Sequence, residues 1–157
     1  MTPDVAPAHV ALFPAALRNV LVVANRLQDF RSIAAKLARM HAEGDVRIHL
    51  LAVEPAPTGH AMQFLRGIDV KRLLREDGLK RLRPLMDLLD ASNVPYRHEV
   101  EVGHWEETIT RFARDRCCKS IVMGDHDARP LGAFLLRHDA WRIRTRLVKL
   151  GIACEML

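Results

Sequence analysis

Cysteine and aromatic residues are scarce in this chain of 157 residues, and no apolar run is long enough to span a membrane. The three cysteines, Cys117, Cys118 and Cys154, are odd in number and lack framework spacing, which argues against a disulfide scaffold. No C-x-x-C motif suggests a zinc or redox site, so we expect buried, reduced thiols. The apolar stretches fall short of the roughly 18 residues of a spanning helix, which predicts a protein without a membrane partner.

Short catalytic motifs are missing as well. The sequence contains no G-x-S-x-G elbow, no P-loop and no dinucleotide-binding G-x-G-x-x-G. Cys117 and Cys118 follow the third predicted helix, which places them opposite the strand ends where an α/β sheet binds ligands. No feature of the sequence points to an enzyme, and we predict a protein without a catalytic site.

Residues 1–17 read as an N-terminal extension that precedes the folded domain. The segment carries three prolines and no basic start, so it is a poor secretion signal. Together with the reduced cysteines, this predicts a cytoplasmic protein.

The composition is that of one globular domain with an excess of positive charge. Hydrophobic residues make up 49% and charged residues 27%, and the net charge is +5. Such a charge favours polyanions, but it is spread over the chain and aromatic residues make up only 5%. Solvated helix faces explain this pattern better than a nucleic-acid groove, so nucleic acid is not the expected partner.

Apolar runs with the length of strands alternate with amphipathic helical segments. The predicted strands are Asn19–Asn25, Val46–Glu54, Tyr96–Val102, Ser120–Gly124 and Ile152–Leu157. Helices are expected after each of the first four, beginning near Phe30, Val70, Trp105 and Ala140. This alternation predicts a three-layer α/β fold with a parallel sheet, either flavodoxin-like or half of a Rossmann fold.

Two residues interrupt the second predicted helix. Gly78 is expected to weaken it, and Pro84 is expected to kink it or split it in two. Gly44 is placed to end the first helix.

Four segments carry a resemblance to the universal stress protein A family. They are NVLVVAN from residue 19, the helix and strand from Phe30 to Pro55, VEVGHWEETITRFARD from residue 100, and IVMGDHDARPLGAFLLRHDAWRI from residue 121. The last segment matches the family pattern I-V-M-G-x6-L-G-x-x-L-L without a gap. The resemblance covers residues 19–157. It implies a universal stress protein-like domain over residues 18–157 and a five-stranded parallel sheet of order 3-2-1-4-5 with four helices.

In the nucleotide-binding members of this family, ATP lies at the carboxyl ends of the strands. The loop after their fourth strand reads G-x-x-G-x9-G-[ST], which lets backbone amides approach the phosphates. Here Gly124 matches the first glycine, but Asp127 and Arg137 replace the other two and His138 replaces the hydroxyl. The resemblance therefore places this chain with the members that lack the glycine motif and are generally regarded as not binding ATP.

A residual nucleotide site is the alternative that the resemblance leaves open. Asn25 stands where the first strand of those members ends in an acid, and Val53 carries over at the end of the second strand. In this alternative Gly124, Arg129 and Arg137 bind the phosphates, since arginine binds phosphate bidentately, and Val53 covers a base through backbone contacts. Adenine nucleotide would then be the ligand, with at most slow hydrolysis.

Two sets of residues with histidine are candidate sites, and we expect structural roles for both. Asp125, His126, Asp127 and His138 are metal-type ligands, but their spacing fits turn and helix-capping roles better. His49 within the second strand is predicted to be a hydrogen-bonded core histidine.

The predicted function is a cytosolic stress-response regulatory binding protein with an unknown protein partner. A further alternative is a basic adaptor that binds an acidic partner through Arg142, Arg146 and Lys149 on the last helix, although a solvated helix face is favoured for these residues. Family members commonly form homodimers, and the apolar fifth strand at the sheet edge predicts one here.

Overall fold

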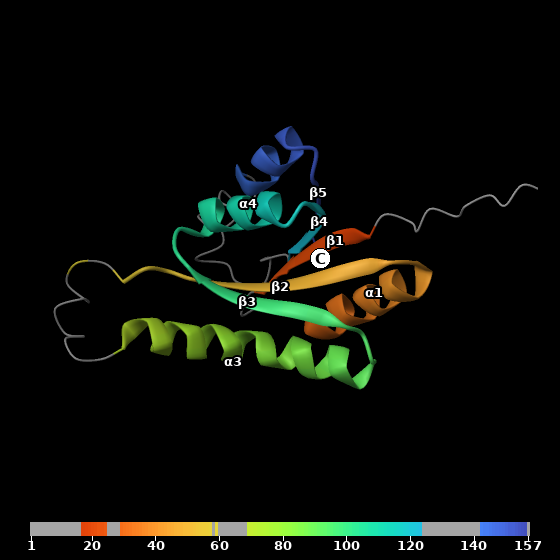
Figure 1. Cartoon of the computed structure of the whole chain (residues 1–157), viewed down its shortest axis with the longest axis horizontal. Helices are drawn as coiled ribbons and strands as arrows, with labels where there is room; N and C mark the ends of the chain where they lie inside the picture. The colour runs from red at the N-terminus through yellow and green to blue at the C-terminus, as the bar shows by residue number, and fades with distance from the viewer. Residues whose placement is uncertain (1–16, 25–28, 58, 60–68, 124–141, 157) are drawn as a thin grey trace, which may run out of the picture.

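Helices and strands alternate along the chain in the computed structural model, which describes residues 17–24, 29–57, 59, 69–123 and 142–156 (Figure 1). The elements are β1 (Arg18–Val23), α1 (Phe30–Glu43), β2 (Val46–Glu54), α3 (Val70–Ala91), β3 (Tyr96–Val102), α4 (Trp105–Asp115), β4 (Cys118–Met123) and β5 (Ala153–Met156). A further helical segment covers residues 142–149, and Gly151 follows it with the positive φ of 70° that favours glycine. The predicted extension over residues 1–17 lies outside the described residues except for Leu17.

The five strands form one parallel sheet in the order β3-β2-β1-β4-β5, which confirms the predicted fold class. Strand β1 lies in the middle, with Val22 beside Leu50 of β2 and beside Val122 of β4. The chain runs outward from β1 to β2 and β3, and then returns to the other side of β1 for β4 and β5. This reversal places the topological switch point between β1 and β4.

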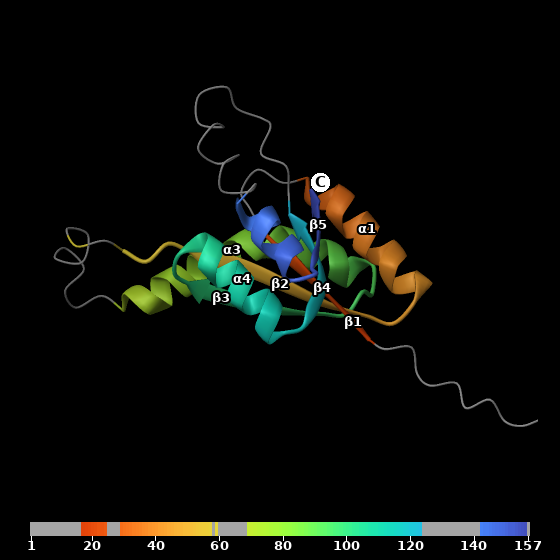
Figure 2. The same ribbon diagram turned by 90° about the horizontal axis from the view of Figure 1, so that it is seen from above.

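Helices cover both faces of the sheet, as Figures 1 and 2 show together. Helices α1 and α3 pack on one face, and α4 and the helical segment 142–149 pack on the other. Alternate residues of β1 point into the two resulting cores: Val20 and Val22 into the first, Leu21 and Val23 into the second. All four are at most 1% exposed, which explains the continuous apolar run in the sequence.

Helix α3 is continuous over 22 residues, so the prediction that Pro84 splits it is wrong. Pro84 is exposed, whereas Leu82, Leu85 and Leu89 are fully buried against the sheet. The packing of these leucines outweighs the backbone hydrogen bond that proline removes. Although α3 is long, no helix among the described residues is apolar enough to cross a lipid bilayer.

Gly78 allows α3 to lie close to β3. A Cβ atom at this position would overlap Cγ1 of Val100 and lie 2.9 Å from its Cγ2. The residue that weakens the helix by propensity therefore permits the closest contact between α3 and the edge strand.

We predict that Gly78→Ala destabilises the protein, although alanine favours helix formation by about 1 kcal/mol. The added methyl group must displace Val100, and overpacking of this kind costs about 1–3 kcal/mol. Urea unfolding would measure the loss, and Gly78→Ala with Val100→Ala should recover part of it. Gly44→Ala is the matched control, because nothing lies within 4 Å of a Cβ atom there. A Gly78→Ala variant more stable than the natural sequence would contradict this account.

Candidate functional site

The carboxyl ends of the strands form the edge at which this fold binds ligands. Among the predicted site residues, Asn25, Gly124, Arg129 and Arg137 lie outside the described residues, as do Asp125, His126, Asp127 and His138 of the weighed metal group. Val53 is described: its side chain is 3% exposed and packs in the core under α4. At this edge the structure therefore describes the end of β2 and the residues that pack around it.

A buried ion pair closes the end of β2. Nη2 of Arg81, on α3, lies 2.9 Å from Oε1 and 3.2 Å from Oε2 of Glu54, with hydrogen-bond geometry towards Oε2. The side chains of Arg81 and Glu54 are only 15% and 6% exposed. Because a buried charge without a partner is unfavourable, each of these residues requires the other.

Arg81 also forms a hydrogen bond with the backbone of Val53, the residue for which the family resemblance implies contacts with a base. Its Nη1 donates a hydrogen bond of 3.3 Å to the carbonyl oxygen of Val53, and the next carbonyl, that of Glu54, accepts from the amide of Gly103 at 2.9 Å. Both carbonyls at the end of β2 therefore already accept a hydrogen bond from the protein itself. Sequence reasoning missed Arg81, since only the packing of α3 brings it across the end of β2.

A second buried carboxylate, Glu106, lies in the first turn of α4, where the helix dipole favours negative charge. Two arginines of the segment 142–149 pair with it: Nε of Arg146 lies 3.0 Å and Nε of Arg142 3.6 Å from its oxygens. Two members of the predicted basic stripe on the last helix thus share one carboxylate of the domain. Of its three members, only Lys149 lacks an ion pair within the described residues.

His49 differs from its prediction as a hydrogen-bonded core residue. It is 3% exposed, yet neither ring nitrogen has a hydrogen-bond partner among the described residues. Burial is the main cause that lowers its pKa, followed by the nearby Arg116. It lies in the first half of β2, away from the carboxyl ends of the strands.

Two of the three cysteines lie in surroundings that disfavour the thiolate. Burial raises the pKa of Cys118 to about 11, and it also raises the pKa of Cys154. Cys117 is exposed rather than buried as predicted, because it occupies the turn before β4 with a positive φ of 49°. Cys118 begins β4, which confirms its place opposite the carboxyl ends of the strands.

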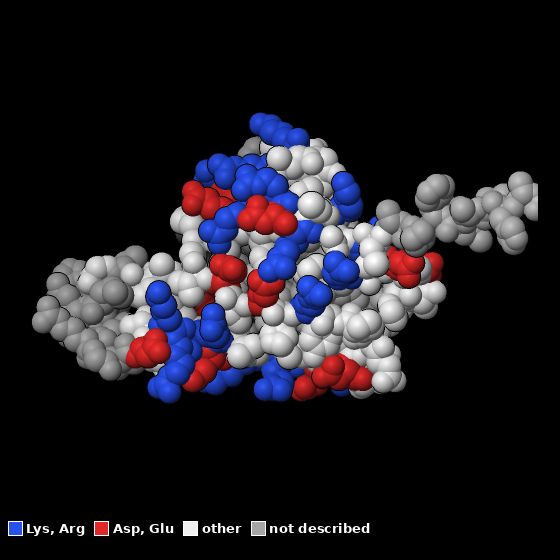
Figure 3. Space-filling model, in the orientation of Figure 1, with Lys and Arg blue, Asp and Glu red and all other residues white. Residues whose placement is uncertain are grey.

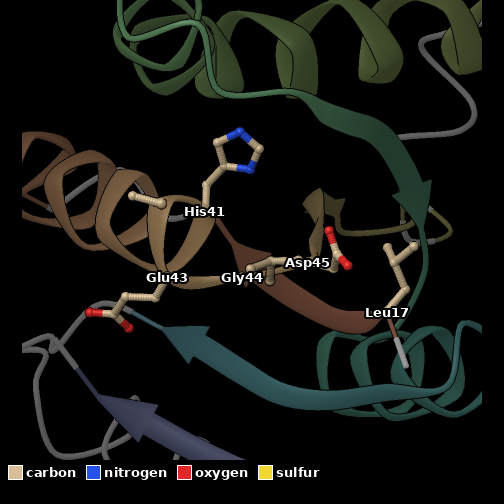
Figure 4. A pocket seen from close by; sticks show the side chains of 7 residues that line it. Leu17, His41, Glu43, Gly44 and Asp45 are labelled. Atoms are coloured by element: carbon tan, nitrogen blue, oxygen red, sulfur yellow. The ribbon is translucent and has the colours of Figure 1, made fainter. Parts of the chain in front are cut away.

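A pocket of about 270 Å³ lies at the turn between α1 and β2 (Figure 4). It contains His41, Glu43 and Asp45, but Figure 4 shows these side chains pointing in different directions. No group of three metal-type ligands occurs within the ranges that the structure describes. The pocket therefore does not provide a metal site.

Residues 16–144 match the sequence profile of the universal stress protein family. The chain belongs to this family. Comparison with curated proteins gives no significant match.

Solved universal stress proteins share the fold at low sequence identity. One solved in complex with cAMP has a TM-score of 0.64 at 14% identity, covering 91% of this chain and 98% of its own. A family member from Burkholderia pseudomallei has a TM-score of 0.60 at 19% identity, covering 92% and 98%. One from Archaeoglobus fulgidus in complex with dAMP has a TM-score of 0.57 at 12% identity, covering 90% and 98%. At these identities the likeness concerns the fold alone.

In this universal stress protein, we predict that Arg81→Met lowers the free energy of unfolding by about 3–5 kcal/mol, because it leaves the carboxylate of Glu54 buried and unpaired. The double variant Arg81→Met with Glu54→Leu should be more stable than Arg81→Met alone. Denaturant unfolding of the two single variants and the double variant measures the coupling.

Arg72→Met is the matched control on the same helix. Its ion pair with Glu76 spans 3.9 Å between side chains 68% and 51% exposed, so its loss should change stability by less than about 1 kcal/mol. Strictly additive effects of Arg81→Met and Glu54→Leu would show that the two side chains are not energetically coupled.

Proposed function

We propose that this universal stress protein is a regulatory binding protein of the stress response that does not bind ATP in the manner of the nucleotide-binding members. The observation that carries the proposal is the hydrogen bond from Arg81 to the carbonyl of Val53. The family resemblance implies base contacts through the backbone at this position, and here the carbonyl already has a donor. The salt bridge to Glu54 holds that donor in place.

The sequence of the loop after β4 supports the same proposal. Asp127 and Arg137 stand where glycines would let backbone amides reach the phosphates. Asp125 and Asp127 add negative charge there, and repulsion from a phosphate at 4–6 Å costs on the order of 1–4 kcal/mol in a partly dry site. The end of β2 disfavours the base and the loop disfavours the phosphates, so the two effects act on different parts of one ligand.

The second candidate is an adenine-nucleotide-binding protein with at most slow hydrolysis. The solved relatives that hold cAMP and dAMP favour it, since they share the fold over nearly the whole chain. In this candidate Gly124, Arg129 and Arg137 hold the phosphates and Asn25 lies at the end of β1. The carbonyl of Val53 is then freed by a movement of Arg81.

An adaptor role through the last helix is less well supported. Arg142 and Arg146 share the carboxylate of Glu106, so an acidic partner would have to compete with a carboxylate of the domain itself for both side chains.

Titration of the full-length protein with Mg-ATP tests the proposal. We expect no binding at micromolar nucleotide in isothermal calorimetry, because Arg81 already donates to the carbonyl of Val53 and the loop sequence lacks two of the three glycines. Micromolar binding that is lost in Arg129→Ala with Arg137→Ala would overturn the proposal in favour of the second candidate. Circular dichroism of each sample ensures that lost binding is not lost folding.

We also propose that the protein forms a homodimer through β5, the last strand in the sheet order, which pairs with β4 alone among the described strands. Sedimentation at micromolar protein is expected to give the mass of a dimer. A monomeric mass under these conditions would contradict the proposal.

A further inference from the structure

A polar cluster lies on the α4 side of the sheet, in the first halves of β2 and β3 and away from the carboxyl ends of the strands. His49 and Arg97 are register partners on neighbouring strands, so their side chains share one face. Arg47 and Glu99 stand two positions from these partners and share that face as well. We call Arg47, His49, Arg97, Glu99 and Arg116 the basic cluster.

The end of α4 brings Arg116 to this cluster. The carbonyl of Arg116 accepts a hydrogen bond of 2.7 Å from Nδ2 of Asn19, which is the register partner of Arg47. Its guanidinium lies 5.4 Å from the ring centroid of Phe112 and forms an ion pair with Glu99. Three arginines therefore meet one glutamate, which leaves two positive charges uncompensated in the cluster.

The uncompensated charges belong to Arg47 and Arg97. Both are exposed, and neither has an ion pair or hydrogen bond from its side chain to any described residue. Figure 3 shows basic side chains gathered over this part of β2 and β3, between α4 and α3. Both arginines belong to the lining of a pocket of about 220 Å³, together with Leu17, Val46, Ile48, Pro95 and Tyr96. Guanidinium groups are the donors that best match a tetrahedral oxyanion, and two arginines border this pocket.

His49, the register partner of Arg97, is buried without hydrogen-bond partners for its ring among the described residues. Its ring meets the ring of Phe112 edge to face at a centroid distance of 6.2 Å, and both of its nitrogens lack a partner in the described part of the chain. Leaving a buried polar group unpaired costs about 1–3 kcal/mol, so stability alone does not account for a histidine here.

We propose that the basic cluster binds a small phosphate-class oxyanion through Arg47 and Arg97, and that protonation of His49 strengthens this binding as the pH falls. The site is separate from the nucleotide edge, at the opposite half of the sheet.

The sign of the pH effect follows from the groups around His49. Burial lowers its pKa most, Arg116, Arg47 and Arg97 lower it further, and Glu99 opposes them. His49 is therefore neutral near neutral pH and gains its proton in the acidic range. An anion on the arginines offsets their charge and raises this pKa, so by linkage acidity tightens anion binding.

Sulfate is the first probe, because it stays dianionic at both about pH 5.5 and about pH 8 and any pH dependence must come from the protein. Titration of the full-length protein is followed by amide and histidine-ring NMR signals. We expect shifts centred on Arg47, His49 and Arg97, with affinity at least about fivefold higher at the lower pH, the lower end of couplings between sites. Inorganic phosphate should compete with sulfate, and acetate at equal concentration should not.

Variants separate this site from its alternatives. Arg47→Gln with Arg97→Gln should weaken sulfate binding at least tenfold, whereas Arg39→Gln on α1, across the sheet, should leave it unchanged. His49→Leu should still bind at about pH 8 but lose the pH dependence. Arg129→Ala with Arg137→Ala should have no effect, which distinguishes this site from the loop after β4.

Sulfate shifts spread over all basic surfaces, or binding unchanged in Arg47→Gln with Arg97→Gln, would overturn the site. A pH dependence that persists in folded His49→Leu would overturn the role of His49. Competition by acetate as effective as that by phosphate would show a general anion surface rather than a phosphate-class site.

Discussion

The central strand β1 sets the constraint on which the rest of the structure depends. It pairs with β2 on one side and β4 on the other, and Val20 to Ala24 are at most 2% exposed. A strand in this position meets no water on either face, so both faces must be apolar and both must be covered by helices. The two cores, their four described helical segments and the parallel order of strands all follow from this burial.

Because the interior of the sheet is apolar, its buried charges lie at the ends of elements. Glu54 ends β2 and fixes α3 through Arg81, while Glu106 opens α4 and holds the segment 142–149 through Arg146. Such pairs contribute little net stability, since desolvation offsets their attraction, but each strongly disfavours arrangements that separate it. The residue that pairs with Glu54, Arg81, also donates a hydrogen bond to the carbonyl of Val53.

Periodicity predicted most of the fold, because strands buried on both faces and helices with one apolar stripe leave strong local patterns. The strand order came from the family resemblance, since local patterns do not say which strands are neighbours. The continuity of α3 through Pro84 was not predicted for a physical reason: helix propensity is local, while the packing of Leu82 is tertiary. The contact of Gly78 with Val100 is tertiary as well and leaves no local pattern. No local sequence pattern shows that Arg81, Arg142 and Arg146 pair with distant carboxylates. Nor does the sequence show that both ring nitrogens of His49 lack a hydrogen-bond partner among the described residues.

The nucleotide content of the freshly purified protein is the most direct test of whether this protein has lost ATP binding. The nucleotide is released by denaturation and identified by mass spectrometry. We expect no stoichiometric adenine nucleotide, because Arg81 already donates a hydrogen bond to the carbonyl of Val53 and the loop after β4 lacks the second and third glycines of the family motif. Stoichiometric ATP, AMP or cyclic nucleotide in the released fraction would contradict it and would mean that arginines have replaced the glycine cradle.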